Sequence, residues 1–84
     1  MAKFCELILT CADQKEADKI ANKLLKNHLV ACIRQIPISS AYWWKGKIEK
    51  TDEILLLMES QEHLFDKIEK EVLKIHSYET PGFW

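Results

Sequence analysis

The side chains that could coordinate a transition metal are spread along the whole chain. The candidate donors are Cys11, Cys32, His28, His63, His76, Glu53 and Glu79. Copper and other late transition metals favour thiolate and imidazole ligands, with carboxylates as further donors. The spacing of the cysteines matches no zinc knuckle or ribbon, so no motif by itself demands a metal.

Each candidate donor also has a structural role open to it. The cysteines suit buried structural thiols, because cysteine is among the most buried residue types. His28 suits the end of a helix, where a cation is favourable, and His63 suits the surface of a charged helix. Glu53 is either a site carboxylate or a residue on a strand face. His76 is either a ligand or a loop imidazole that shapes a turn by hydrogen bonding.

An enzymatic function is not indicated. A nucleophile pair of Cys11 or Cys32 with His76 is conceivable, but no activating sequence context accompanies it. The only glycines are Gly46 and Gly82, so a glycine-rich phosphate-binding loop is absent from the sequence. We therefore expect a protein without catalytic residues.

Composition limits the partners of the chain. Its 84 residues allow one domain, residues 1–84, with 48% hydrophobic and 30% charged residues. Twelve basic residues stand against thirteen acidic ones, a net charge of −1 without a run of one sign. This balance removes the usual electrostatic reason to expect a nucleic acid or an anionic membrane surface as a partner. No apolar stretch approaches the roughly 18 residues of a membrane span.

The cysteines and the N-terminal residues indicate the cellular compartment in which the protein is expected. Three cysteines cannot form a fully paired disulfide set. Residues 1–4 lack the apolar region and cleavage site of a signal peptide, so export is not indicated. We expect reduced thiols and a cytoplasmic location.

The hydrophobic pattern switches between strand and helix periods. Residues 4–9 form a short apolar run that is typical of a buried strand. A helix is expected from Asp13, since Glu16 three residues later suits a capping box. An apolar stripe at helical spacing follows, formed by Ala17, Ile20, Ala21, Leu24 and Leu25. Asn27 and His28 suit the end of this helix.

Two further strands are predicted in the middle of the chain. The second strand spans residues 29–44 and is interrupted at Pro37. Proline cannot donate to a ladder, so Pro37 marks an edge, a bulge or a bend. After a turn near Lys45–Gly46, a return strand runs to Met58, with a kink at Thr51–Asp52.

A second helix follows, with Ser60 as the expected N-cap. Its apolar positions at helical spacing are Leu64, Phe65, Ile68, Val72 and Ile75. Residues 76–82 indicate a loop, because proline and glycine end regular structure, and only Phe83 and Trp84 remain. The order β-α-β-β-α predicts an α+β fold, a ferredoxin-like βαββαβ sandwich with a truncated last strand. The uncovered edge of the first strand favours pairing with another chain.

Two adjacent tryptophans lie in the segment Ser40–Glu49. Successive side chains of a strand point to opposite faces, so Trp43 and Trp44 cannot both enter one core. One of them needs a second apolar surface, and in a chain this small that surface suggests another subunit. The alternative is a hairpin tip with one tryptophan in the core and one exposed.

Several segments together resemble the CutA divalent-cation tolerance proteins. The matching segments are Thr10 with the first helix, Leu29–Ile33, Pro37, Ser40–Glu49, Glu53 with Leu55–Leu57, and His76–Pro81. The last segment is similar to the family's His-Pro-Tyr-Glu-x-Pro loop, with Ser77 in place of the usual proline. The resemblance covers nearly the whole chain.

This resemblance implies how the chain assembles and what it does. It implies a tight homotrimer of ferredoxin-like subunits whose long central hairpins reach across to neighbours. Tyr42, Trp43 and Trp44 are then expected at the trimer interface. It also implies a cytoplasmic protein with a role in the tolerance of divalent cations, copper in particular. No cofactor other than a divalent metal ion is expected.

The resemblance also ranks the candidate ligands. His76 is the leading one, because it lies in the matched loop close to Glu79. The full set of expected metal ligands is His76, Cys11, Cys32, Glu53 and Glu79.

Other functions stay open at this point. The implied trimer is architecturally similar to the PII signalling proteins, so a signalling or scaffold module is the alternative. Such a module binds a small molecule or a protein partner in clefts between subunits. An RNA-binding domain on a similar topology is less favoured, because it needs stacking aromatics and a basic sheet. Phe4 is the only aromatic on the first strand, and the net charge is −1.

Overall fold

A computed structural model describes residues 3–75 of the chain. Its elements are β1 (Phe4–Cys11), α1 (Gln14–Lys26), β2 (Cys32–Trp44), β3 (Lys47–Gln61), a 3₁₀ turn (Glu62–Leu64) and α2 (Phe65–Ile75). The predicted β-α-β-β-α order is confirmed. The predicted loop after the second helix and the truncated last strand fall on residues 76–84, outside the described residues.

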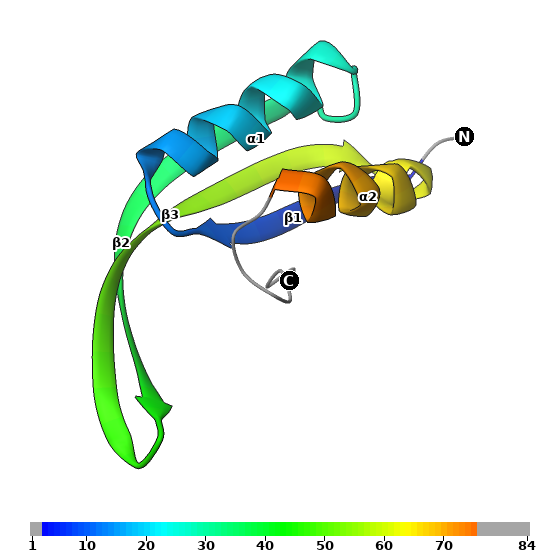
Figure 1. Ribbon diagram of the computed structural model, residues 1–84. Helices are drawn as coiled ribbons and strands as arrows, with labels where there is room; N and C mark the ends of the chain where they lie inside the picture. The colour runs from blue at the N-terminus through cyan, green and yellow to red at the C-terminus, as the bar shows by residue number, and fades with distance from the viewer. Residues whose placement is uncertain (1–2, 76–84) are drawn as a thin grey trace.

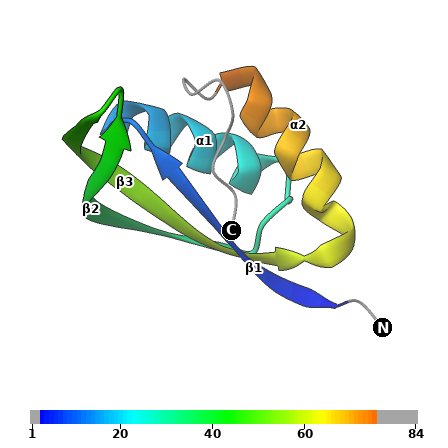
Figure 2. The same ribbon diagram turned by 90° about the horizontal axis from the view of Figure 1, so that it is seen from below.

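One antiparallel sheet carries both helices on the same face (Figures 1 and 2). The strand order is β1-β3-β2, so β3 lies in the centre. β1 pairs with residues 54–61 of β3, and β2 pairs with residues 47–59. The result is two layers, and the sheet face opposite the helices is bare in the described chain. We call it the open sheet face.

A pair of reciprocal hydrogen bonds fixes the start of α1. The Asp13 carboxylate accepts a hydrogen bond from the Glu16 backbone N–H at 2.8 Å. The Glu16 carboxylate accepts one from the Ala12 backbone N–H at 3.0 Å. Both amides lie at the helix entry, where backbone donors lack partners within the helix. The predicted Asp13 cap is confirmed. The Glu16 side chain accepts its hydrogen bond from Ala12, the residue before the cap.

The hydrophobic core fills the space between the helices and the sheet. Its fully buried large side chains are Leu9, Ile20, Leu24, Leu56, Met58, Ile68, Val72 and Cys11. The sequence places Leu25 in the same apolar stripe, but Leu25 is 42% exposed. That prediction is wrong because the buried positions of α1 end at Leu24 and leave Leu25 on the flank of the helix. None of the helices within residues 3–75 is long and apolar enough to cross a membrane.

The two long strands are more regular than the sequence suggests. β2 begins at Cys32 and continues through Pro37, which lies opposite Ile54 in the register. The predicted interruption is wrong, whereas the edge, one of the three interpretations of Pro37, is confirmed, because β2 is an edge strand of the described sheet and an edge tolerates proline where its nitrogen faces away from the neighbour. At the predicted kink, Thr51–Asp52, β3 stays paired with β2 through both residues, so the ladder continues without a break.

Ser60 lies inside β3 and does not cap a helix. It is only 4% exposed, and its hydroxyl donates a hydrogen bond to the Leu29 carbonyl at 2.6 Å. Beside it, the Ala31 backbone N–H donates to the Glu59 carbonyl at 2.8 Å. These two bonds tie the end of β3 to the loop between α1 and β2, and α2 starts only after the 3₁₀ turn.

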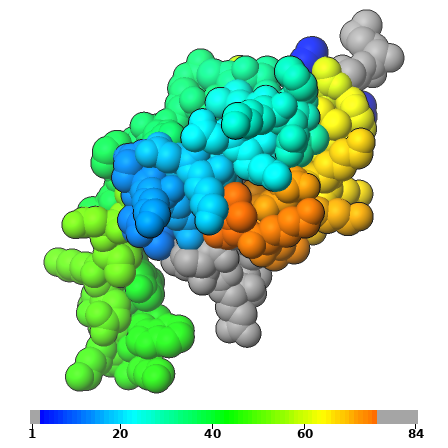
Figure 3. Space-filling view, turned by 45° about the horizontal axis from the view of Figure 1, so that its top comes forward, coloured from blue at the N-terminus to red at the C-terminus, as the bar shows by residue number. Residues whose placement is uncertain are grey.

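β2 and β3 continue far beyond the end of β1. β1 stops opposite Ile54, so residues 38–53 form a two-stranded extension that we call the hairpin arm. Figures 1 and 3 show the arm projecting from the body of the molecule. Lys45 and Gly46 close it with φ values of 50° and 77°. Positive φ at both positions is typical of a type I′ turn, whose twist matches the flanking strands.

We predict that Ser60→Ala lowers the free energy of unfolding by about 1–3 kcal/mol, because the buried Leu29 carbonyl loses its partner. Urea unfolding followed by circular dichroism measures the change. Ser39→Ala is the matched control, since Ser39 is exposed on the hairpin arm and its loss should cost less than about 0.5 kcal/mol. Equal losses in both variants would show that the Ser60 bond contributes nothing specific.

Candidate functional site

The tip of the hairpin arm exposes large apolar side chains on both of its faces. Trp43 is 74% exposed, Trp44 58%, and Ile48 60%. Trp43 lies opposite Ile48 in the register, whereas Trp44 lies opposite Lys47, so the two rings belong to different faces. The Lys45 ammonium lies 5.7 Å from the centre of the Trp44 ring. The described chain buries neither tryptophan, so the alternative of one core tryptophan is wrong.

The open sheet face is apolar along its middle. Leu7, Leu9 and Cys11 of β1 face the helices, so the residues between them alternate to the opposite face. The register brings several apolar side chains to that face, namely Ile8, Leu55, Leu57, Ile36 and Ile38. Ile36 is 41% exposed. This face continues without a break into the hairpin arm.

A charged row ends the apolar part of the open sheet face. Glu59 lies opposite Glu6 on one side and opposite Cys32 on the other. The Arg34 guanidinium donates a hydrogen bond to the Glu59 carboxylate at 3.2 Å. That bond is the main reason why the pKa of Arg34 is raised. Cys32 is therefore a partly exposed residue beside a salt bridge, at the start of β2.

Cys11 occupies a very different environment. Its side chain is fully buried at the end of β1. Burial raises the pKa of the Cys11 thiol to about 12, and neighbouring carboxylates act in the same direction. These carboxylates belong to Glu16, Asp13 and Glu53. The thiolate is the form that binds metals, so a thiol that stays protonated at neutral pH is a poor ligand.

The structure does not bring the two predicted thiol ligands together. Cys11 lies opposite Ile54 on one side of β3, and Cys32 lies opposite Glu59 on the other side. Five residues of an extended strand span about 17 Å, so one ion cannot contact both sulfur atoms. Glu53 is next to Ile54, where the hairpin arm begins, but strand alternation directs it to the open sheet face.

The remaining predicted donors do not complete a site in the part of the chain that is described. His76 and Glu79 lie outside the described residues, so their role as ligands stays a prediction. Among residues 3–75, no three histidine, cysteine, aspartate or glutamate side chains lie close enough to hold a metal ion.

The other histidines have the structural positions that the sequence suggests. His28 follows the end of α1 in the left-handed region, with φ of 54°. Its backbone N–H donates to the Leu25 carbonyl at 3.1 Å, and that of Leu29 donates to Leu24 at 3.0 Å. This arrangement satisfies the last carbonyls of the helix. His63 is exposed in the 3₁₀ turn.

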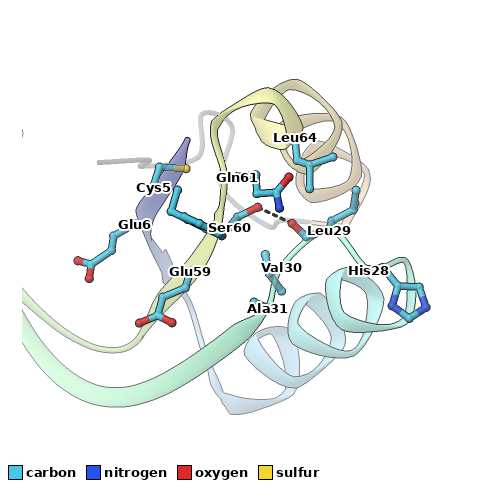
Figure 4. Close-up of a pocket in the computed structure, with 11 residues that line it drawn as sticks. Cys5, Glu6, His28, Leu29, Val30, Ala31, Glu59, Ser60, Gln61 and Leu64 are labelled. Atoms are coloured by element: carbon cyan, nitrogen blue, oxygen red, sulfur yellow. Dashed lines mark hydrogen bonds between the residues drawn. The ribbon is translucent and has the colours of Figure 1, made fainter. Parts of the chain in front are cut away.

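A groove of about 690 Å³ lies where β1 begins and β3 ends (Figure 4). Figure 4 shows the Cys5 and Ser60 side chains on its sheet side and Leu64 across from them. Its histidine, His28, lies at the far end, well apart from the carboxylate of Glu59. Sequence reasoning missed this groove, because three segments distant in the chain form it and none carries a local motif.

Comparison with known proteins identifies the fold and its family. A family model described as "CutA1 divalent ion tolerance protein" matches residues 5–84, nearly the entire chain. The chain belongs to the CutA1 family. The resemblance inferred from the hairpin and the His76–Pro81 loop is thereby confirmed.

Individual relatives agree with this assignment. The divalent-cation tolerance protein CutA of Archaeoglobus fulgidus is 37% identical over 75 residues, which cover 89% of this chain and 74% of that protein. Mouse protein CutA is 39% identical over 73 residues, which cover 86% of this chain but only 41% of the mouse protein. The crystal structure of the divalent ion tolerance protein CutA1 from Ehrlichia chaffeensis matches with a TM-score of 0.93 at 28% identity. That match covers 100% of this chain and 79% of the other.

We predict that Cys11 resists alkylation in the native CutA1 protein, because its thiol is buried and stays protonated below a pKa of about 12. N-ethylmaleimide at pH 8, followed by peptide mass spectrometry, measures the labelling of each cysteine. Cys5 and Cys32 are partly exposed and should react before Cys11, whereas all three cysteines should react in guanidinium. Native labelling of Cys11 as fast as that of Cys5 would contradict the burial that the structure describes.

Proposed function

We propose that the protein is a homotrimeric, cytoplasmic member of the CutA1 family that binds copper-like divalent cations and contributes to metal-ion tolerance. Family membership supports the role in divalent-cation tolerance. The observation that carries the proposed assembly is the hairpin arm, with aromatic side chains exposed on both faces.

The arm has a physical reason to contact other copies of the chain. An isolated two-stranded hairpin is at best marginally stable in water, and this arm extends beyond the last residue of β1. Burying Tyr42, Trp43 and Trp44 against a neighbour supplies the missing apolar contact. The open sheet face adds a second apolar surface next to the arm. The number of three subunits rests on the resemblance to the CutA proteins.

The proposed metal site uses residues from more than one part of the assembly. The donors within residues 3–75 do not converge in a single chain. We therefore place His76 and Glu79 at the centre of the site, with Glu53 or Cys32 of a neighbouring subunit as further donors. Cys11 is the least suitable of the predicted ligands, because its thiol is buried and protonated.

A second candidate function is a PII-like signalling or scaffold module. Two observations favour it: the donors within residues 3–75 are dispersed, and a partly apolar groove lies beside Cys5 and Leu64. Such a module would hold a small molecule or a protein partner in clefts that assembly completes. It requires no metal ligand at all.

The proposed cytoplasmic location rests on the thiols. Cys5, Cys11 and Cys32 are all unpaired. Free thiols are usual in a reducing compartment, where glutathione and thioredoxin keep cysteines reduced.

We predict that His76→Ala weakens binding of Cu²⁺ by at least about tenfold, because an imidazole is a preferred ligand of this ion. Isothermal titration of the reduced protein with Cu²⁺ at pH 7.4 measures the affinity. His63→Ala is the matched control, since it removes an exposed imidazole from the 3₁₀ turn.

Two outcomes of that titration distinguish the candidate functions. Selective loss in His76→Ala, with His63→Ala unchanged, supports the metal site. Equal Cu²⁺ binding by all three proteins contradicts it and favours the signalling or scaffold module.

We predict that Trp43→Ala/Trp44→Ala weakens subunit assembly while helix content stays intact, because both rings lie on the arm and outside the core. Light scattering measures the mass, and far-ultraviolet circular dichroism measures the helix content. Leu73→Ala is the control, since Leu73 is 53% exposed on α2, in the opposite layer. A double variant that stays fully trimeric would remove the arm from the proposed interface.

A further inference from the structure

The helix layer contains a groove that gathers positive charge. It lies between α1 and α2, which run side by side in Figures 1 and 3, and it has a volume of about 410 Å³. Its polar lining consists of Lys19, Asn22, Lys23, Lys26, Glu71 and Lys74. We call this feature the lysine groove. None of the lining residues within 3–75 is a predicted metal ligand or a residue of the hairpin arm.

The lysines line up because of helical geometry. Lys19, Lys23 and Lys26 are separated by four and three residues, so they form one row along α1. Seven residues of helix span about 10 Å, so the row presents three charges along that length. Ile20 and Leu24 anchor the helix in the core directly beside the row. The buried side chains of α1 therefore hold the helix in place, and the lysines do not determine where the groove lies.

The lining that residues 3–75 contribute to the groove is strongly positive. Within this part of the chain, Glu71 is the one acidic residue of the lining, against four lysines, which leaves a net charge of +3. Its carboxylate lies 3.3 Å from the Lys74 ammonium and 4.0 Å from that of Lys23. The side chain of Glu71 is only 21% exposed, whereas those of Lys23 and Lys74 are 52% and 68% exposed. Exposed ion pairs of this kind are weak, so both lysines are free to turn toward a ligand.

We infer that the lysine groove binds a linear polyphosphate chain. A row of flexible ammonium groups suits a ligand whose negative charges are also arranged in a row, because each lysine acts as a separate point charge for phosphate. The volume lies in the range of small-molecule sites. A single-stranded nucleic acid fits less well, since the lining contributed by residues 3–75 has one apolar residue, Ile75, and no aromatic side chain for base stacking.

The site is independent of the proposed metal function. It lies on the helix layer, whereas the hairpin arm and the open sheet face belong to the sheet layer. A failure of metal binding would leave this inference untouched, and the reverse is also true.

Titration with inorganic tripolyphosphate tests the inference. The full chain is freed of metal ions with a chelating resin, so that a metal cannot bridge the anion to another site. Isothermal titration calorimetry at low ionic strength should give saturable binding that falls as salt rises. Lys23→Gln/Lys74→Gln should weaken binding by at least about tenfold. Lys15→Gln/Lys70→Gln is the matched control, because it removes the same charge from exposed positions outside the groove lining.

A variant that is expected to strengthen tripolyphosphate binding distinguishes a direct effect on binding from a loss of folding. Glu71→Gln removes the single negative charge of the groove and should tighten tripolyphosphate binding several-fold. Loss of fold cannot produce such a gain. Equal affinities of the two double variants would overturn the inference, and so would unchanged or weaker binding by Glu71→Gln.

Other anions identify the chemistry that is recognised. Citrate carries three carboxylates in a compact shape and should bind more weakly than tripolyphosphate. If ATP binds as tightly as tripolyphosphate, the nucleoside contributes nothing, and the groove recognises the phosphate chain alone. Tighter binding of citrate would overturn the polyphosphate assignment.

Discussion

The register of β3 is the constraint on which the rest of the structure depends. This one strand pairs with β1 along its second half and with β2 along residues 47–59. The same alternation turns Leu56, Met58 and Ser60 toward the helices and leaves Leu55 and Leu57 on the open sheet face. A slip of one residue would exchange the two faces and place a charged glutamate against the helices. The buried bond from Ser60 to the α1–β2 loop opposes such a slip.

The unequal lengths of the strands give the molecule its unusual shape. β1 has 8 residues, whereas β2 has 13 and β3 has 15. The excess length has no third strand and no helix beside it, so it projects as the hairpin arm and gives an extent of 47 Å against 23 and 21 Å. A chain of 84 residues builds a modest core, and the three aromatic side chains of the arm, Tyr42, Trp43 and Trp44, lie outside that core. Such an arrangement is favourable only if another surface covers the arm.

The sequence predicts those features that depend on neighbouring residues. The cap at Asp13, the stripe from Ala17 to Leu24 and the turn at Lys45–Gly46 are local patterns, and all three are present. Ser60 could not be placed, and Pro37 could not be assigned to one of its three interpretations, because their roles depend on where β3 ends and on which strand lies at the edge. A proline that breaks a central strand is harmless in an edge strand, and a serine suited to a cap is equally suited to a buried hydrogen bond.

The candidate site is less predictable than the fold, for a different physical reason. Donor type indicates that Cys11 could bind a metal, but only the packing shows that its thiol is buried and held in the protonated form. Likewise, Cys11 and Cys32 are equivalent as donor types, yet they lie on opposite sides of β3. In the sequence, the lysines of α1 indicate only a solvated helix face. The packing of α2 against α1 places Lys74 in the lining of the same groove.

The distribution of donors links the two parts of the proposed function. If a metal site draws ligands from two subunits, the ion binds the assembly and not the separate chain. Binding then stabilises the trimer by mass action, and the apparent affinity depends on protein concentration. A site built within one chain would show no such dependence. On the proposed function, the dispersed donors of residues 3–75 and the exposed aromatics of the arm have one explanation, because another copy of the chain would complete both the metal site and the apolar surface.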